Sequence, residues 1–157
     1  GGRRDAHVGD ASLELLLALL FLTGCTSFDT LRHESFTMAV PSWKQQSIVE
    51  DFGIANGFFS TNGDCIFNLS ISREFYLQVT QPFFQRLRLA NPQALLQYDI
   101  FESLVLLHYE LPNGRKGDAR ILACPSGFTY LADFSCSTAA YERHHDTIIS
   151  SLDSMDC

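Results

Sequence analysis

Alternating apolar and polar residues predict three strands in the first half of the chain. Residues 36–40 alternate with a period of two and stop at Pro41, which is typical of a strand and its end. Two further runs, residues 53–60 and 65–71, flank Asn62-Gly63, a pair that favours a tight hairpin turn because both residues tolerate positive φ. These two runs are therefore expected to pair as antiparallel strands.

The second half of the chain predicts a meander of three strands. Residues 101–111 place alternate apolar side chains on one face and give the clearest strand pattern of the chain. Pro112-Asn113-Gly114 predicts a turn. Residues 120–124 and 128–134 predict the next two strands, with Ser126-Gly127 as the turn between them.

Apolar residues recur at helical spacing in two segments. Ser72 is expected to cap a helix that begins at Arg73, and Pro82 is expected to kink or divide this helix. Ser137 or Thr138 is expected to cap the last helix of the chain. The apolar positions that define the two helical faces are Phe75, Val79, Phe83 and Leu87 in the first helix, and Tyr141, Ile148 and Leu152 in the last.

The order of these elements predicts an α+β fold. Short turns join consecutive strands, so the strands must pair as antiparallel neighbours, and a sheet with an apolar face needs helices to cover it. We therefore expect an antiparallel sheet of about six strands packed with two main helices, an α+β sandwich. This single domain is expected at residues 35–157.

The N-terminal segment has the pattern of an export signal. Arg3 and Arg4 precede the apolar run LLLALLFLT at residues 15–23, which is too short to span a bilayer as a helix. This run leads into Leu22-Thr23-Gly24-Cys25, which is similar to the lipobox of bacterial lipoproteins. The resemblance implies that the thiol of Cys25 receives a diacylglycerol and that Cys25 becomes the first mature residue.

The expected organisation is a signal peptide at residues 1–24 and a polar tether at residues 25–34, followed by the domain. Asp5, Asp10 and Glu14 are unusual in the part of a signal peptide that is normally basic. Two alternatives therefore stay open. The apolar run could be a helix buried in the body, or it could be an ordinary signal peptide without a lipid.

Composition and charge limit the classes of partner. The 157 residues are 46% hydrophobic, enough for a packed core, and they carry a net charge of −7. Binding to nucleic acid without sequence preference requires clustered Lys and Arg, so we expect no nucleic-acid partner. An acidic body is also not attracted to anionic lipids, so attachment to a membrane depends on the lipid anchor.

The five cysteines are compatible with export. If Cys25 carries lipid, then Cys65, Cys124, Cys136 and Cys157 remain, and an even number in an exported protein permits disulfides in three possible connectivities. The expected hairpin between Cys124 and Cys136 argues against a bond between those two. We favour the interpretation that some of these cysteines fill apolar positions in strands.

One cluster, Glu142-Arg143-His144-His145-Asp146, suggests a catalytic or metal site. Adjacent histidines point about 100° apart on a helix, whereas two metal ligands on one helical face need a spacing of three or four. We favour one histidine at the edge of the packed face and the other in solvent. His33, in the tether, and His108, on a strand, have no motif partner. We therefore assign no catalytic, cofactor-binding or metal residue and expect no cofactor.

Two short patches carry a resemblance to a known family. Residues 36–43 (FTMAVPSW) fit an opening strand followed by a turn with Pro and Trp, and residues 130–134 (YLADF), Tyr141 and residues 148–152 (IISSL) fit a last strand and a closing helix. These patches, with the element order over about residues 35–153, resemble the α/β/α family that includes the PsbP-type extrinsic photosystem subunits and the DcrB-like bacterial lipoproteins. The resemblance implies an exported or lipid-anchored body without catalytic residues, which acts in binding or assembly.

These observations predict a lipoprotein, anchored to a membrane of the cell envelope through Cys25, whose non-catalytic domain binds a protein or assembly partner. One alternative is a metal-dependent or thiol hydrolase that uses His144, His145 and a cysteine. Another is a soluble exported binding module that has disulfides and no lipid.

Overall fold

The structure, a computed structural model, describes residues 27–51 and 54–157. The expected signal peptide and Cys25 lie outside these residues. Neither helix of the described residues is long and apolar enough to cross a membrane. In chain order the elements are β1 (Phe28–His33), β2 (Phe36–Pro41), β3 (Lys44–Asp51), β4 (Ile54–Asn62), β5 (Cys65–Ser72), α2 (Tyr76–Ala90), β6 (Leu95–Ile100), β7 (Leu104–Glu110), β8 (Arg115–Ala123), β9 (Thr129–Ser137) and α3 (Thr138–Asp153).

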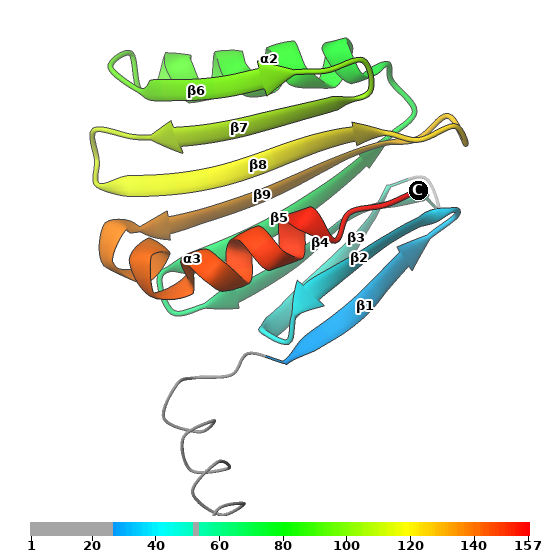
Figure 1. The fold of residues 1–157 in the computed structure, drawn as a ribbon, viewed down its shortest axis with the longest axis horizontal. Coiled ribbons are helices and arrows are strands. Elements are labelled where there is room, and N and C mark those ends of the chain that lie inside the picture. Colours follow the sequence, from blue (N-terminus) through cyan, green and yellow to red (C-terminus); the bar gives the residue numbers. More distant parts are fainter. Residues whose placement is uncertain (1–26, 52–53) are drawn as a thin grey trace, which may run out of the picture.

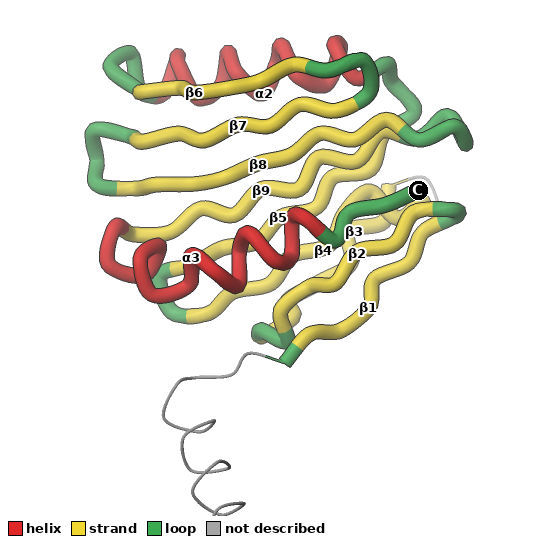
Figure 2. Tube along the Cα trace, in the orientation of Figure 1, coloured by secondary structure: helices red, strands yellow, loops and turns green. Residues whose placement is uncertain are grey.

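The strands form two antiparallel sheets (Figures 1 and 2). The larger sheet has seven strands in the order β3-β4-β5-β9-β8-β7-β6, and β1 and β2 form a separate two-stranded sheet. The last strand, β9, lies at the centre of the larger sheet and joins the β3–β5 half to the β6–β8 half. The predicted α+β class, an antiparallel sheet packed with two main helices, is confirmed.

The period-two alternation of β9 separates two apolar cores. Tyr130, Ala132 and Phe134 are fully buried on the face that α3 and the β1–β2 hairpin cover, as the pattern of residues 128–134 predicts. The intervening Leu131 belongs to a second cluster, on the other face, which includes Phe83 of α2. The sheet is therefore the middle layer of a sandwich, between α2 and the layer formed by α3 with the hairpin (Figure 1).

Serine hydroxyls at the end of α3 hold the β1–β2 hairpin in place. Ser151 donates its hydroxyl to the carbonyl oxygen of Ala39 at 2.6 Å, and the backbone N–H of Ala39 donates to Oγ of Ser154 at 2.8 Å. At the other end of the helix, Ser137 is the N-cap, as predicted, and accepts from the N–H of Ala140. Residues of one helix thus connect the hairpin to the end of β9.

The segment expected to be a tether contains a strand. Phe28–His33 pairs along its whole length with β2, from Phe28 opposite Pro41 to His33 opposite Phe36. The strand was not predicted because most side chains of this segment are polar. An edge strand that faces solvent needs few apolar residues. The prediction of a tether is therefore wrong for these six residues.

The first helix differs from its prediction at two points. Ser72 ends β5 and does not cap the helix, which begins at Tyr76 after Phe75 in the N-cap position. Oγ of Ser72 instead accepts from the N–H of Glu74 at 3.0 Å and stabilises the turn between strand and helix. Pro82 lies inside α2, which continues through it to Ala90, so of the two expected effects, a kink or a division, the division is wrong.

Besides β1, two strands of the large sheet were not predicted, and one was predicted too long. Strand β7 begins at Leu104, and its buried residues Val105, Leu107 and Tyr109 confirm the predicted apolar face. The first three residues of the predicted strand, 101–103, form a bend that follows the edge strand β6. Both edge strands of the large sheet, β3 (KQQSIVED) and β6 (LLQYDI), lack a regular alternation, so their sequences give no clear strand signal.

Candidate functional site

Two disulfide bonds lock the ends of the central strands. Cys65 and Cys136 lie directly opposite each other on β5 and β9 and are fully buried. Cys124, which follows β8, is bonded to Cys157 at the end of the sequence. The favoured interpretation, that some of these cysteines are apolar fillers and not disulfide partners, is therefore wrong. The sequence could not give this pairing because it depends on which strands are neighbours.

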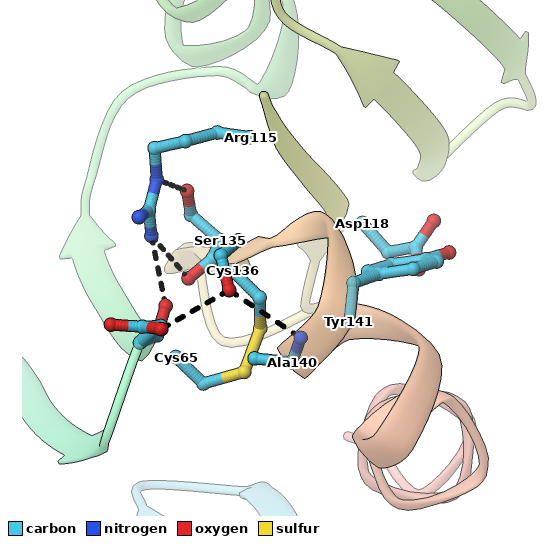
Figure 3. The surroundings of a disulfide bond; sticks show 9 residues. Cys65, Arg115, Asp118, Ser135, Cys136, Ala140 and Tyr141 are labelled. Atoms are coloured by element: carbon cyan, nitrogen blue, oxygen red, sulfur yellow. Dashed lines mark hydrogen bonds between the residues drawn. A yellow bond between two sulfur atoms is a disulfide. The ribbon is translucent and has the colours of Figure 1, made fainter. Parts of the chain in front are cut away.

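Arg115 ties together the strands that surround the Cys65–Cys136 bond (Figure 3). Its guanidinium donates from Nε to Oγ of Ser135 at 3.1 Å, and from Nη2 to the carbonyl oxygens of Ser135 at 2.8 Å and Asp64 at 3.3 Å. Asp64 lies in the turn before β5, and Ser135 lies on β9. One side chain of β8 therefore fixes both neighbouring segments, so the disulfide lies in a rigid end of the sheet.

The disulfides also determine which cysteine thiols are available. Each sulfur forms one disulfide, so the four described cysteines pair with one another and are not available to Cys25. Cys25 lies outside the described residues, and its lipidation stays a prediction. A thiol hydrolase needs a free thiol, and the four described cysteines do not provide one.

The two adjacent histidines of α3 have different surroundings. His144 packs edge-on against Trp43, with ring centroids 5.6 Å apart, and burial lowers its pKa. His145 is half exposed, and its Nδ1 lies 3.7 Å from Oδ1 of Asp146. The pair therefore does not converge on one ligand. Among residues 27–51 and 54–157, no group of three or more His, Cys, Asp or Glu is placed to hold a metal ion.

A different polar network lies beneath α3, around the carboxylate of Asp118 on β8. Tyr141 of α3 donates its hydroxyl to Oδ2 of Asp118 at 2.6 Å, and Nδ1 of His108 on β7 lies 2.9 Å from Oδ1. Asp118 is only 8% exposed, so it depends on these polar partners. Burial and the hydrogen bond to Asp118 raise the pKa of Tyr141, which keeps its phenol a proton donor.

The network reaches the surface through Glu110 and Lys116. Oε1 of Glu110 lies 3.4 Å from Nε2 of His108 and 3.6 Å from Nζ of Lys116, and Lys116 also lies 3.6 Å from Glu142 of α3. The hydrogen bond with His108 and the charge of Lys116 lower the pKa of Glu110. Oppositely charged groups thus alternate across the junction of α3 and the sheet.

A depression of about 370 Å³ opens beside this network, between α3 and strands β6 to β8. His108 and Asp118 form part of its wall, together with the polar residues Gln97, Asp99 and Arg120. Both ring nitrogens of His108 face carboxylates, and the Tyr141 hydroxyl donates to Asp118. These three residues therefore satisfy one another and do not form an activated nucleophile with its base. The arrangement suits recognition of polar groups on a ligand or partner.

The sequence held a signal for this network. His108 and Asp118 are cross-strand partners, because Pro112-Asn113-Gly114 closes the hairpin between β7 and β8. A turn at those residues places positions 108 and 118 opposite each other, and this is the signal in the sequence that would have found the pair. Tyr141 was predicted on the packed face of the last helix; that its hydroxyl meets Asp118 depends on where α3 crosses the sheet.

Comparisons with known proteins identify the fold. No protein-family model and no curated protein matches the chain. Cyanobacterial PsbP (CyanoP) from Synechocystis sp. PCC 6803 matches with a TM-score of 0.57 and 15% identity over 85% of this chain and 94% of that one. The Ran-binding protein Mog1p from Saccharomyces cerevisiae matches with a TM-score of 0.55 and 8% identity over 84% of this chain and 96% of Mog1p.

A third solved structure, the putative regulator PA94 from Pseudomonas aeruginosa, is described as a protein of unknown function. It matches with a TM-score of 0.50 and 12% identity over 83% of this chain and 97% of PA94. At these identities the likeness concerns the fold alone. The chain has a PsbP- and Mog1-like α+β fold, which confirms the PsbP-like architecture that the two sequence patches imply.

Proposed function

We propose that the chain is a lipoprotein of the cell envelope, anchored through an acylated Cys25, whose body is a non-catalytic domain that binds a protein partner. The observation that carries this proposal is the cysteine pairing. Four of the five cysteines form two disulfides, which is typical of proteins in oxidising compartments outside the cytosol. The remaining one, Cys25, is the cysteine of the lipobox-like segment.

The start of the folded body supports an anchor at this position. Strand β1 begins at Phe28, three residues after Cys25. Three residues span at most about 11 Å, so the lipid would hold the beginning of β1 close to the membrane surface. Two or more acyl chains are needed for stable attachment, and the lipobox resemblance implies at least two.

Two observations support a binding role. Mog1p, which shares the fold, is a Ran-binding protein. The depression beside His108 and Asp118 lies between α3 and strands β6 to β8, and its walls carry charged and hydrogen-bonding groups. We propose that the protein partner contacts this depression, because charged groups that lie beside a concave surface give an interface orientation and specificity.

Metabolic labelling with an alkyne fatty acid tests the anchor. We expect the exported full chain to incorporate the label and to yield an N-terminal peptide that begins at acylated Cys25. A Cys25→Ser variant should lose the label. A Cys157→Ser variant, which removes a different cysteine, should retain it. Equal labelling of the Cys25→Ser variant would contradict the proposal. An unlabelled, exported and disulfide-bonded protein would favour the soluble binding module instead.

Site-specific photocrosslinking in cells tests the binding surface. A photoreactive residue at Gln97 lies in the depression, whereas one at Gln85 lies on the exposed side of α2 and provides a matched control. We expect a discrete protein adduct from position 97 and none of the same mass from position 85. The same adducts from both positions would contradict a partner site in the depression.

A further inference from the structure

A second cavity, of about 360 Å³, separates the β1–β2 hairpin from strands β4 and β5. Its size is at the lower end of the range for small-ligand pockets. Its walls are mainly apolar and come from four strands and the turn after β2: Leu31, Val40, Trp43, Phe58, Leu69 and Ile71.

The walls include apolar side chains that the protein leaves partly uncovered. Leu31, Phe58 and Ile71 pack against the buried core but keep part of their surface accessible. Burial of such surface by an apolar ligand is favourable in proportion to the area removed from water. The hairpin and the sheet therefore form two apolar walls with room for an alkyl chain between them.

One polar atom of this wall is unsatisfied. Nε1 of Trp43 is buried and has no hydrogen-bond partner in the described part of the chain. Buried polar groups in proteins almost always have a partner, so an unpaired indole N–H at a cavity wall indicates a missing acceptor. Nε1 itself has no accessible surface, so a ligand oxygen would accept this hydrogen bond only after a shift of the indole ring.

The mouth of the cavity carries a free cation. Asp29, Thr30 and Arg32 of β1 are exposed and line the cavity, and Arg32 forms no ion pair with any described residue. His33 also lines the cavity, but its ring Nδ1 is engaged with the hydroxyl of Tyr130 at 2.8 Å. Among the described residues that line the cavity, Arg32 is therefore the cation without an ion pair, and it can attract an anionic head group although Asp29 also lines the cavity.

We propose that this cavity binds a fatty acid taken up from the surrounding membrane, with the alkyl chain between the hairpin and the sheet and the carboxylate at Arg32. The supply of lipid rests on the proposed anchoring, which holds β1 close to the membrane. The cavity itself does not depend on the anchor, so the two proposals can be tested separately.

Fluorescence of Trp43 provides a direct measurement, because it is the only tryptophan of the chain. The full chain is prepared in the exported form and as a Cys25→Ser variant, and each is titrated with lauric acid. We expect a saturable change in Trp43 emission in both forms, and native mass spectrometry should show one lauric acid per chain. No change in emission, or no bound lauric acid at saturation, would overturn the proposal.

Two variants locate the ligand. Ile71→Gln places an amide in the apolar wall and should weaken lauric acid binding about tenfold, whereas Leu89→Gln, at a residue 82% exposed on α2, should leave it unchanged. Arg32→Gln should weaken binding of lauric acid but not of dodecanol, which has no charge. Equal binding by wild type and Ile71→Gln, with both folded by circular dichroism, would overturn the placement in this cavity.

The same titrations separate the possible sources of the alkyl chain. If lauric acid binds Cys25→Ser but not the acylated protein, the protein's own acyl chain fills the cavity, which would overturn an outside fatty acid as the ligand. If mass spectrometry finds no acyl group on Cys25 while lauric acid still binds, the anchor proposal fails and the cavity proposal stands.

Discussion

The ring of Tyr109 on β7 packs across Gly117, its cross-strand partner on β8. A Cβ at position 117 would overlap the ring and hydroxyl of Tyr109 and would come within 2.5 Å of the carbonyl oxygen of Phe134. Glycine therefore leaves the space that Tyr109 needs. From there the Tyr109 hydroxyl donates to Oδ1 of Asp133 on β9 at 2.7 Å. One glycine on β8 thus allows a side chain of β7 to reach β9.

We expect Gly117→Ala to destabilise the protein by about 2 kcal/mol, because the added methyl group forces the fully buried ring of Tyr109 to move. Urea denaturation measures the change in the free energy of unfolding. In a Tyr109→Ala background the same substitution should cost less, because the clash with the ring is removed while the close approach to the Phe134 carbonyl oxygen remains. An equal cost in both backgrounds would contradict steric exclusion by Tyr109.

The stability of the protein should depend on the ionisation of Asp133. Burial raises its pKa to about 6, against the opposing effects of the Tyr109 hydrogen bond and the charges of Arg86 and Arg115. Because this value lies above that of an unfolded aspartate, 3.8, the contribution is fully present below pH 3.8 and is lost as the pH rises through about 6.

Asp133→Asn should remove this component of the pH dependence. Between pH 4 and pH 7, the free energy of unfolding of the wild type should fall by about 2 kcal/mol relative to that of the variant, as measured by urea denaturation at each pH. Asp146→Asn, at a fully exposed carboxylate of α3, is the control and should retain the wild-type slope. Parallel pH profiles for wild type and Asp133→Asn would argue against a buried titrating carboxylate.

The sequence predicted the elements that bury an apolar face and missed those at edges. The alternation of Val105, Leu107 and Tyr109 and the spacing of Ile148 and Leu152 reflect burial, so pattern alone located β7 and α3. Strands β1, β3 and β6 each pair on one side with the strand that follows them in the sequence, and β1 and β6 expose most of their side chains. Strands of this kind need not alternate apolar and polar residues, so the sequence pattern does not predict them.

The disulfides and the polar network could be predicted from the sequence less well than the strands and helices. The disulfide between Cys65 and Cys136 requires β5 and β9 to be adjacent, and these strands are separated in the chain by α2 and three other strands. The hydroxyl of Tyr141 meets Asp118 only because α3 crosses β8 at that point. Long-range placement of this kind follows from packing of the whole domain and not from local spacing.

The Tyr141–Asp118 hydrogen bond should contribute measurably to stability. Tyr141→Phe removes the hydroxyl but keeps the ring, and it leaves the buried Asp118 carboxylate with one donor fewer. We expect a loss of about 2 kcal/mol in the free energy of unfolding. Tyr98→Phe, at a residue 48% exposed on β6, is the control and should cost less than about 0.5 kcal/mol. Equal costs for the two variants would contradict a structural role of the hydroxyl.

The Cys124–Cys157 disulfide should hold the C-terminal segment against the hairpin. Asp156 exchanges two backbone hydrogen bonds with Thr37 of β2, at 2.9 and 3.0 Å, and the disulfide fixes the residue that follows it. The bond closes a loop of 33 residues, so removing it as Cys124→Ala with Cys157→Ala should cost up to about 4 kcal/mol through the entropy of the unfolded chain.

Hydrogen exchange near the C-terminal segment distinguishes the roles of the two disulfides. In the double variant, the Thr37 amide should exchange its hydrogen faster than in the wild type, because the end of the chain can separate from β2 without unfolding the domain. Cys65→Ala with Cys136→Ala is the matched control. It removes a bond at the other end of β9 and should lower global stability without selective exposure of Thr37. Unchanged exchange at Thr37 in the first variant would show that backbone pairing alone holds this segment, and that the disulfide is dispensable there.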